Sequence, residues 1–370
     1  MTVEAGHEAL RDGRWADARL TFEAALDEGE TPEALEGLGL AARWQHDEQA
    51  ALRAHERAYR LYRARGDHRG AARMAMQLAL HAYNFRSDVV TGRGWMERAR
   101  RLLAEVAGPC PEGGWVRMLG AHLALVIDHD LAAAHRLAQE ATAIGRQVAD
   151  VDIEMFSLAV QGLALVTEGR VEDGMRLLDE AAAAAGAGEI ADVDALQTVY
   201  CYLIYACKRV RDFDRAESWC ARVRETSARW SDRLTLSICR THYADVLLWR
   251  GAWADCEAEL DSAAREFREL NERRVGDVVA RLGELRRRQG RAEEAEALFR
   301  RAETHPVSVL GRAALAIGRG DAGAATDFVE RYLRRLDPGE RTERVAALDL
   351  LVRARVLAGD LAGAAPPPDD

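Results

Sequence analysis

Cysteine and histidine are the residue types in this sequence that most readily suggest metal chemistry. Cys239 and His242 stand three residues apart, so both would lie on one face of a helix. A soft metal ion usually needs a further close pair of ligands, and the sequence has no Cys-x-x-Cys pair to supply it. His129 and His135 are six residues apart and share no helix face. Because free cysteine mostly behaves as a small buried residue, we expect reduced structural thiols, no metal and no cofactor.

Phosphate-binding and nucleophile motifs are the next signs of chemistry. Lys208 is the only lysine, and no Gly-Lys-Ser/Thr phosphate loop surrounds it. Residues 318–323, Gly-Arg-Gly-Asp-Ala-Gly, spell the dinucleotide fingerprint, but no strand is predicted before them, as that motif requires. Neither a Gly-x-Ser-x-Gly elbow nor a His-Glu-x-x-His zinc helix occurs. The sequence therefore predicts a binding protein rather than an enzyme.

The elements that would carry any site are predicted to be helices alone. The 370 residues are 48 % hydrophobic and 30 % charged, and the abundant types are good helix formers. β-branched residues form no alternating strand pattern. The net charge of −10, and the glutamates that flank Arg286, Arg287 and Arg288, argue against a nucleic-acid-binding surface. No apolar run could span a membrane and no secretory signal begins the chain, so we expect a cytoplasmic protein.

A repeated spacing of small and bulky residues organises the chain. From Gly162, steps of seven, five, four and three residues lead to Gly169, Gly174, Leu178 and Ala181. This spacing predicts a first helix, a tight turn, and a second helix that opens with a small residue where the two backbones approach closely. The unit at residues 114–148 fits only in its second half. The other units start at Gly6, Gly39, Leu80, Ile204, Ala244, Gly283 and Ala313. The predicted close-approach residues are Ala18, Ala51, Gly92, Ala134, Gly174, Ala216, Cys256, Ala295 and Ala325.

This pattern resembles the tetratricopeptide repeat, whose usual period is about 34 residues. The resemblance implies an all-α, right-handed superhelical solenoid of tetratricopeptide-like helix pairs. We expect one domain over residues 1–365, with about nine pairs and an incomplete tenth, followed by a Pro-rich acidic tail at 366–370 that forms no domain. A non-repetitive helical bundle is the alternative.

Several stretches are similar to LuxR-type transcriptional regulators of actinobacteria, which carry a tetratricopeptide array before a helix-turn-helix. The stretches are residues 31–39, 162–166 with 169–172, 219–220, 239–243, and 282–286 with 290–291. The resemblance implies a regulatory, ligand- or protein-sensing array. Three prolines at 366–368 follow Ala364 and Ala365, and no helix-turn-helix comes after them. We therefore expect no direct DNA binding by this chain, and the terminus is either a natural short end or a frameshift in a run of alanine codons.

Stacked helix pairs usually bind ligands on the concave side, which the first helices line. Counting from the first small residue of three units gives the side chains that would face this groove. They are His81, Asn84 and Phe85 in one unit, Tyr205, Lys208 and Arg209 in the next, and Thr241, Asp245 and Trp249 in the third. Aromatic, arginine and aspartate side chains suit a peptide, a protein or a small-molecule effector. Burial against a neighbouring repeat is the alternative for each of them.

Two broader expectations follow from the same pattern. A free-standing scaffold that binds a peptide or protein in its groove is the alternative to the regulatory array. Solenoids also need polar capping helices, and the sequence offers none near Leu348 to Leu361. We therefore expect this edge to self-associate or to fray.

Overall fold

The structure, a computed structural model, describes residues 2–83, 88–230 and 233–364, and these residues form helices joined by short turns, with no strand among them. The predicted all-α fold of paired helices is confirmed. No helix in this part of the chain is long and apolar enough to cross a membrane. The predicted tail at 366–370 lies outside the described residues.

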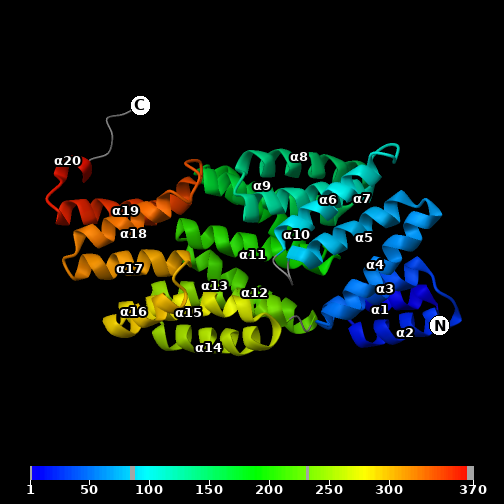
Figure 1. The fold of residues 1–370 in the computed structure, drawn as a ribbon, viewed down its shortest axis with the longest axis horizontal. Helices are drawn as coiled ribbons and strands as arrows, with labels where there is room; N and C mark the ends of the chain where they lie inside the picture. Colours follow the sequence, from blue (N-terminus) through cyan, green and yellow to red (C-terminus); the bar gives the residue numbers. More distant parts are fainter. Residues whose placement is uncertain (1, 84–87, 231–232, 365–370) are drawn as a thin grey trace. The chain divides into compact units, whose positions relative to one another are not determined.

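Consecutive helices pack side by side as antiparallel pairs (Figure 1). The first helices of the pairs are α1 (Val3–Arg11), α3 (Pro32–Trp44), α5 (His68–His81), α7 (Pro111–Leu123), α9 (Val151–Glu168), α11 (Val193–Val210), α13 (Arg233–Arg250), α15 (Val275–Arg288), α17 (Pro306–Gly318) and α19 (Arg341–Leu357). The second helices are α2 (Trp15–Glu28), α4 (Glu48–Arg65), α6 (Val89–Leu103), α8 (Leu131–Val148), α10 (Val171–Ala187), α12 (Phe213–Trp230), α14 (Trp253–Leu270), α16 (Ala292–Arg301), α18 (Ala322–Leu333) and α20 (Leu361–Ala364).

Small residues bring the two helices of a pair into backbone contact. A Cβ atom added at Gly162 in α9 would lie 2.7 Å from the carbonyl oxygen of Gly174 in α10. Gly169 makes the turn between them with a φ of 92°, which side chains rarely tolerate. Every residue predicted at the close-approach place is buried, as in Ala18, Ala216 and Cys256. The repeat spacing thus identifies the residues at which the two helices of a pair approach each other closely.

The chain separates into two compact units. Unit 1 comprises Met1–Gln161, Glu180–Val199 and Ala228–Asp232, and unit 2 comprises Gly162–Asp179, Tyr200–Ser227 and Arg233–Asp370. Phe22, Tyr62 and Met96 lie in the core of unit 1, and Leu260, Phe267 and Phe299 lie in the core of unit 2. The expected single domain over residues 1–365 stays a prediction.

A π-helical turn corrects the predicted register of the unit that starts at Leu80. Ala82 and Tyr83 have π-helical geometry directly after α5, and π-helical geometry adds one residue to the regular helical count. Gly92 at the start of α6 therefore faces Tyr83, as Gly174 faces Val166 in the regular α9–α10 pair. The small residue of this unit is then Ala79, which is fully buried, rather than Leu80.

The same device explains why the unit at residues 114–148 matches the repeat only in its second half. A π-helical segment, η2 (Ala124–Asp128), follows α7 and displaces the first helix by one residue relative to the turn at His129. The second helix, α8, is regular, and Ala134, Ala138 and Ala141 are buried as the pattern requires.

Candidate functional site

Three charged side chains of unit 2 meet on the face that its first helices form. Lys208 of α11 donates through Nζ to Oδ2 of Asp245 in α13, at 3.0 Å. Arg281 of α15 donates through Nε to the same oxygen at 3.1 Å, and through Nη1 to the carbonyl oxygen of Asp277 at 2.9 Å. We call the surface carrying Tyr205, Lys208, Arg209, Asp245 and Arg281 the first-helix face.

Burial and charge set the ionisation of this cluster. Burial opposes ionisation of the Asp245 carboxyl, but Arg281 and Lys208 outweigh it and hold its pKa well below the ordinary value. Burial lowers the pKa of Lys208, and Asp245 offsets only part of that effect. Burial, with Lys208 and Arg281 nearby, also lowers the pKa of His242 well below its ordinary value, so this imidazole is neutral at pH 7. Two cations therefore share one carboxylate.

Arg209 forms a second cluster with groups from α9 and α19. Its guanidinium lies 4.3 Å from the centroid of the Tyr205 ring and pairs with Glu343. One of its Nη atoms donates to Oγ1 of Thr167 and the other to the Tyr205 hydroxyl, both at 2.8 Å. The Tyr205 hydroxyl donates in turn to Glu343 Oε1 at 2.9 Å. A hydrogen bond thus connects α11 and α19 through two residues that are 138 positions apart in sequence.

An aromatic and arginine-rich patch lies at the carboxyl ends of α11 and α13. The Trp249 ring stacks on Phe213, with centroids 5.9 Å apart and planes 18° apart. The guanidinium of Arg288 lies 3.9 Å from its centroid and that of Arg211 lies 4.7 Å from it. Trp249 remains 43 % exposed. We call Arg211, Phe213, Trp249, Arg250 and Arg288 the Trp249 patch.

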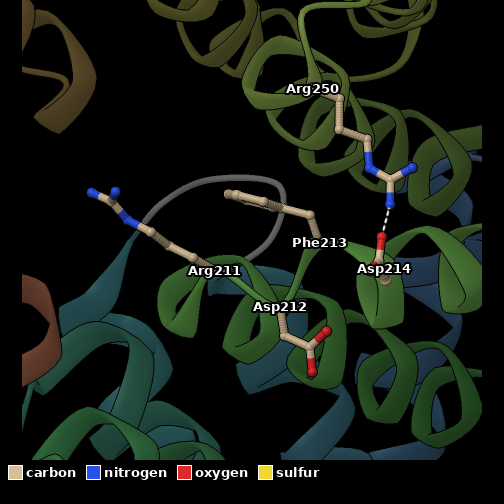
Figure 2. A pocket seen from close by; sticks show the side chains of 5 residues that line it. All are labelled: Arg211, Asp212, Phe213, Asp214 and Arg250. Carbon is tan, nitrogen blue, oxygen red and sulfur yellow. Dashed lines mark hydrogen bonds and ion pairs between the residues drawn. The ribbon is translucent and has the colours of Figure 1, made fainter.

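A shallow open depression of about 540 Å³ adjoins this patch. Figure 2 shows the side chains of Arg211 and Phe213 extending to the same side, while Arg250 reaches Asp214. Asp212 completes the lining. Its carboxylate accepts from the Arg215 backbone N–H at 3.2 Å and pairs with the Arg215 guanidinium, also at 3.2 Å. The acidic side chains of the depression are therefore already engaged.

The structure places the predicted groove residues in different surroundings. Tyr205, Lys208, Arg209 and Asp245 meet on the first-helix face, and Trp249 lies one helical turn beyond Asp245. His81 and Thr241 are buried, and Asn84 and Phe85 lie outside the described residues. The Nε2 atom of His81 lies 3.4 Å from Glu48 Oε1. Whether any of these residues binds a ligand stays a prediction.

Sequence patterns missed two partners of these residues, Arg281 and Glu343. Arg281 stands two residues before Gly283, a place that the repeat count did not include. Glu343 reaches Tyr205 only because α19 returns to α11, which no local spacing reveals.

Cys239, which the sequence pattern singles out with His242, lies beside Cys201. The Sγ atoms of Cys201 and Cys239 are 3.6 Å apart, and all six cysteines are free. Among the described residues, no group of three or more His, Cys, Asp or Glu side chains is placed to hold a metal ion.

Two solved structures resemble this chain in fold. The Rap protein complexed with competence and sporulation factor matches at a TM-score of 0.61 and 12 % identity, over 98 % of this chain and 95 % of that one. NprR in complex with its cognate peptide NprX matches at a TM-score of 0.56 and 12 % identity, over 78 % of this chain and 84 % of that one. The chain is an array of tetratricopeptide-like helix pairs. No family model matches the sequence, and no curated protein matches it either.

Proposed function

We propose that this chain binds a peptide, or an extended segment of a protein, on the first-helix face of unit 2, and that it acts by binding rather than by catalysis. The observation that carries the proposal is the convergence of polar side chains from successive repeats, with Lys208, Asp245 and Arg281 contributed by three different helices. Side chains repeated at helical spacing can pair with successive groups of an extended peptide.

The similar structures support the same proposal. NprR was solved with a cognate peptide, and Rap with competence and sporulation factor. At 12 % identity these likenesses concern the fold, so the ligand class rests on the side chains of this chain. Tyr205, Lys208, Arg209 and Asp245 are the residues proposed to contact the peptide. His81 is left out because it lies in unit 1, and Thr241 because it is only 3 % exposed, against 19 % and 14 % for the Lys208 and Asp245 side chains.

Panning of a phage-displayed library of short random peptides on the full chain tests the proposal. Recovered peptides would be synthesised, and their affinity measured by fluorescence anisotropy. We expect Lys208→Met to weaken binding about tenfold, the effect of one lost charge-assisted hydrogen bond. Arg176→Ala is the matched control, because this arginine of α10 is 76 % exposed and far from the face in sequence. Failure to recover any peptide, or equal affinity in both variants, overturns the proposal.

The narrower possibility, the regulatory array of a LuxR-type regulator, rests on the sequence stretches quoted above. It is distinguished from a free-standing scaffold by a coding sequence for a helix-turn-helix downstream of the array. Reading the gene beyond codon 370 in all three frames tests it, and a downstream sequence without such a motif would favour the scaffold.

A further inference from the structure

The Trp249 patch continues the first-helix face along the same two helices. Asp245 and Trp249 are four residues apart in α13, which is about 6 Å along a helix and keeps both on one side. In the neighbouring repeat, Arg211 follows Lys208 and Arg209 directly after the end of α11. A peptide lying on Lys208 and Asp245 would therefore reach the patch within one helical turn.

Arg211 occupies a turn position that glycine fills in other repeats. Its φ is 63°, in the left-handed region, whereas the corresponding Gly169, Gly251 and Gly290 adopt the same region without a side chain. An arginine there is strained. Its guanidinium contacts the Trp249 ring, and no carboxylate among the described residues lies within ion-pair distance of it.

The neighbouring Arg250 and Arg288, unlike Arg211, already pair with carboxylates of this chain. Arg250 pairs with Asp214 and Glu217, and Arg288 donates to Glu284 Oε1 at 2.9 Å. Arg211 thus supplies the unpaired cation at an open depression, and the half-buried Phe213 and exposed Trp249 supply a flat apolar platform beside it. Arginine and tryptophan are the residue types that contribute most to binding energy at protein interfaces.

We infer that the Trp249 patch binds a carboxylate of the peptide through Arg211, with an apolar or aromatic side chain of the same peptide resting on Trp249 and Phe213. This inference rests on the proposed function and names the ligand class, a peptide with an acidic residue next to an apolar one. A nucleic acid is disfavoured because the chain carries a net charge of −10.

Parallel panning of the same random-peptide phage library on the full wild-type chain and on Arg211→Gly tests the inference. Glycine suits the left-handed turn, so this variant keeps the fold while it removes the guanidinium. We expect wild-type peptides to be enriched in aspartate or glutamate beside an apolar residue, and this enrichment to disappear with Arg211→Gly. In synthetic peptides, replacing that acid by its amide should cost about tenfold in affinity for wild type and nothing for Arg211→Gly.

Arg222→Gln is the matched control, because Arg222 also lies over a tryptophan, Trp219, but on α12 away from the depression. Peptides whose binding depends on Lys208, but not on an acidic residue that pairs with Arg211, would overturn the inference about the Trp249 patch. The proposed function would still stand. Recovery of no peptide by the wild-type chain would overturn both. A single-stranded oligonucleotide that binds more tightly than the peptides, and depends on Arg211, would overturn the peptide class.

Discussion

Lys208 and Arg281 donate to the same carboxylate oxygen of Asp245, from helices on either side of the one that carries it. All three side chains are more than four-fifths buried. Because the two cations have one anion between them, the Asp245 carboxylate links three successive repeats through α11, α13 and α15. Asp245→Asn should therefore lower the free energy of unfolding by about 3 kcal/mol, since it leaves buried charges facing each other.

Lys208→Met should cost less, because Arg281 still neutralises Asp245 in that variant. Urea titrations of both variants, followed by circular dichroism, measure the two values. Equal losses of unfolding free energy in the two variants would show that the Asp245 carboxylate is solvated rather than paired with both cations.

The close approach of helix backbones predicts how glycine-to-alanine substitutions within helices change the stability of the chain. Gly162→Ala should destabilise the chain by about 2 kcal/mol, because the added methyl group would lie 2.7 Å from a backbone oxygen in α10. Gly94→Ala is the control, since Gly94 lies within α6 with no atom within 4 Å of the added Cβ. That change should stabilise α6 by about 0.5–1 kcal/mol, the helix propensity difference. Thermal melts of the two variants should move in opposite directions, and a shift in the same direction would contradict the assigned packing.

Asp192, which directly precedes α11, should make the stability of unit 1 depend on pH. Burial, together with Asp194 and Asp152, raises the pKa of Asp192 to about 7, and Arg43 offsets part of this effect. Because the folded-state pKa exceeds the unfolded value of about 3.9, the folded chain binds the proton more tightly. The stability that this group contributes is present below pH 4 and is lost as the pH rises towards 7.

Asp192→Asn tests that dependence, since its amide oxygen can still accept from the Ala195 backbone N–H, as Oδ1 does now at 2.8 Å. The difference in unfolding free energy between this variant and wild type should grow in favour of the variant between pH 4 and pH 8. A difference that does not change with pH would mean that Asp192 titrates normally.

An exposed apolar stripe on α19 supports the predicted self-association. Val345, Leu348, Val352 and Val356 are each more than 40 % exposed and recur at helical spacing. Light scattering over a range of concentrations should show association of the wild-type chain, and Val352→Glu should abolish it. A wild-type chain that stays monomeric at every concentration would refute the prediction.

The sequence specified the helix pairs because each pair depends on local features. Gly169 and Gly174 identify a turn and a close approach within a few residues of each other, and such local spacing can be read directly. The same holds for Lys208 and Asp245, whose places in two regular repeats put them in contact.

The rest could not be read because it depends on non-local contacts or on irregular helix geometry. The hydrogen bond between Tyr205 and Glu343 joins residues that no repeat step connects. The π-helical geometry at Ala82 and Tyr83, next to His81, could not be read either, because it leaves no clear signature in composition. Arg211 could have been found from its place, because it stands where other units have glycine.

The two π-helical turns of unit 1 also suggest how such an array diversifies. One added residue near the end of a first helix rotates the preceding side chains by about 100° about the helix axis relative to the turn. The second helix keeps its contacts, as α8 does with Ala134 and Ala138 buried. A single inserted or deleted codon can therefore exchange the whole set of displayed side chains without unfolding the repeat, which gives evolution a route to new ligands in one step.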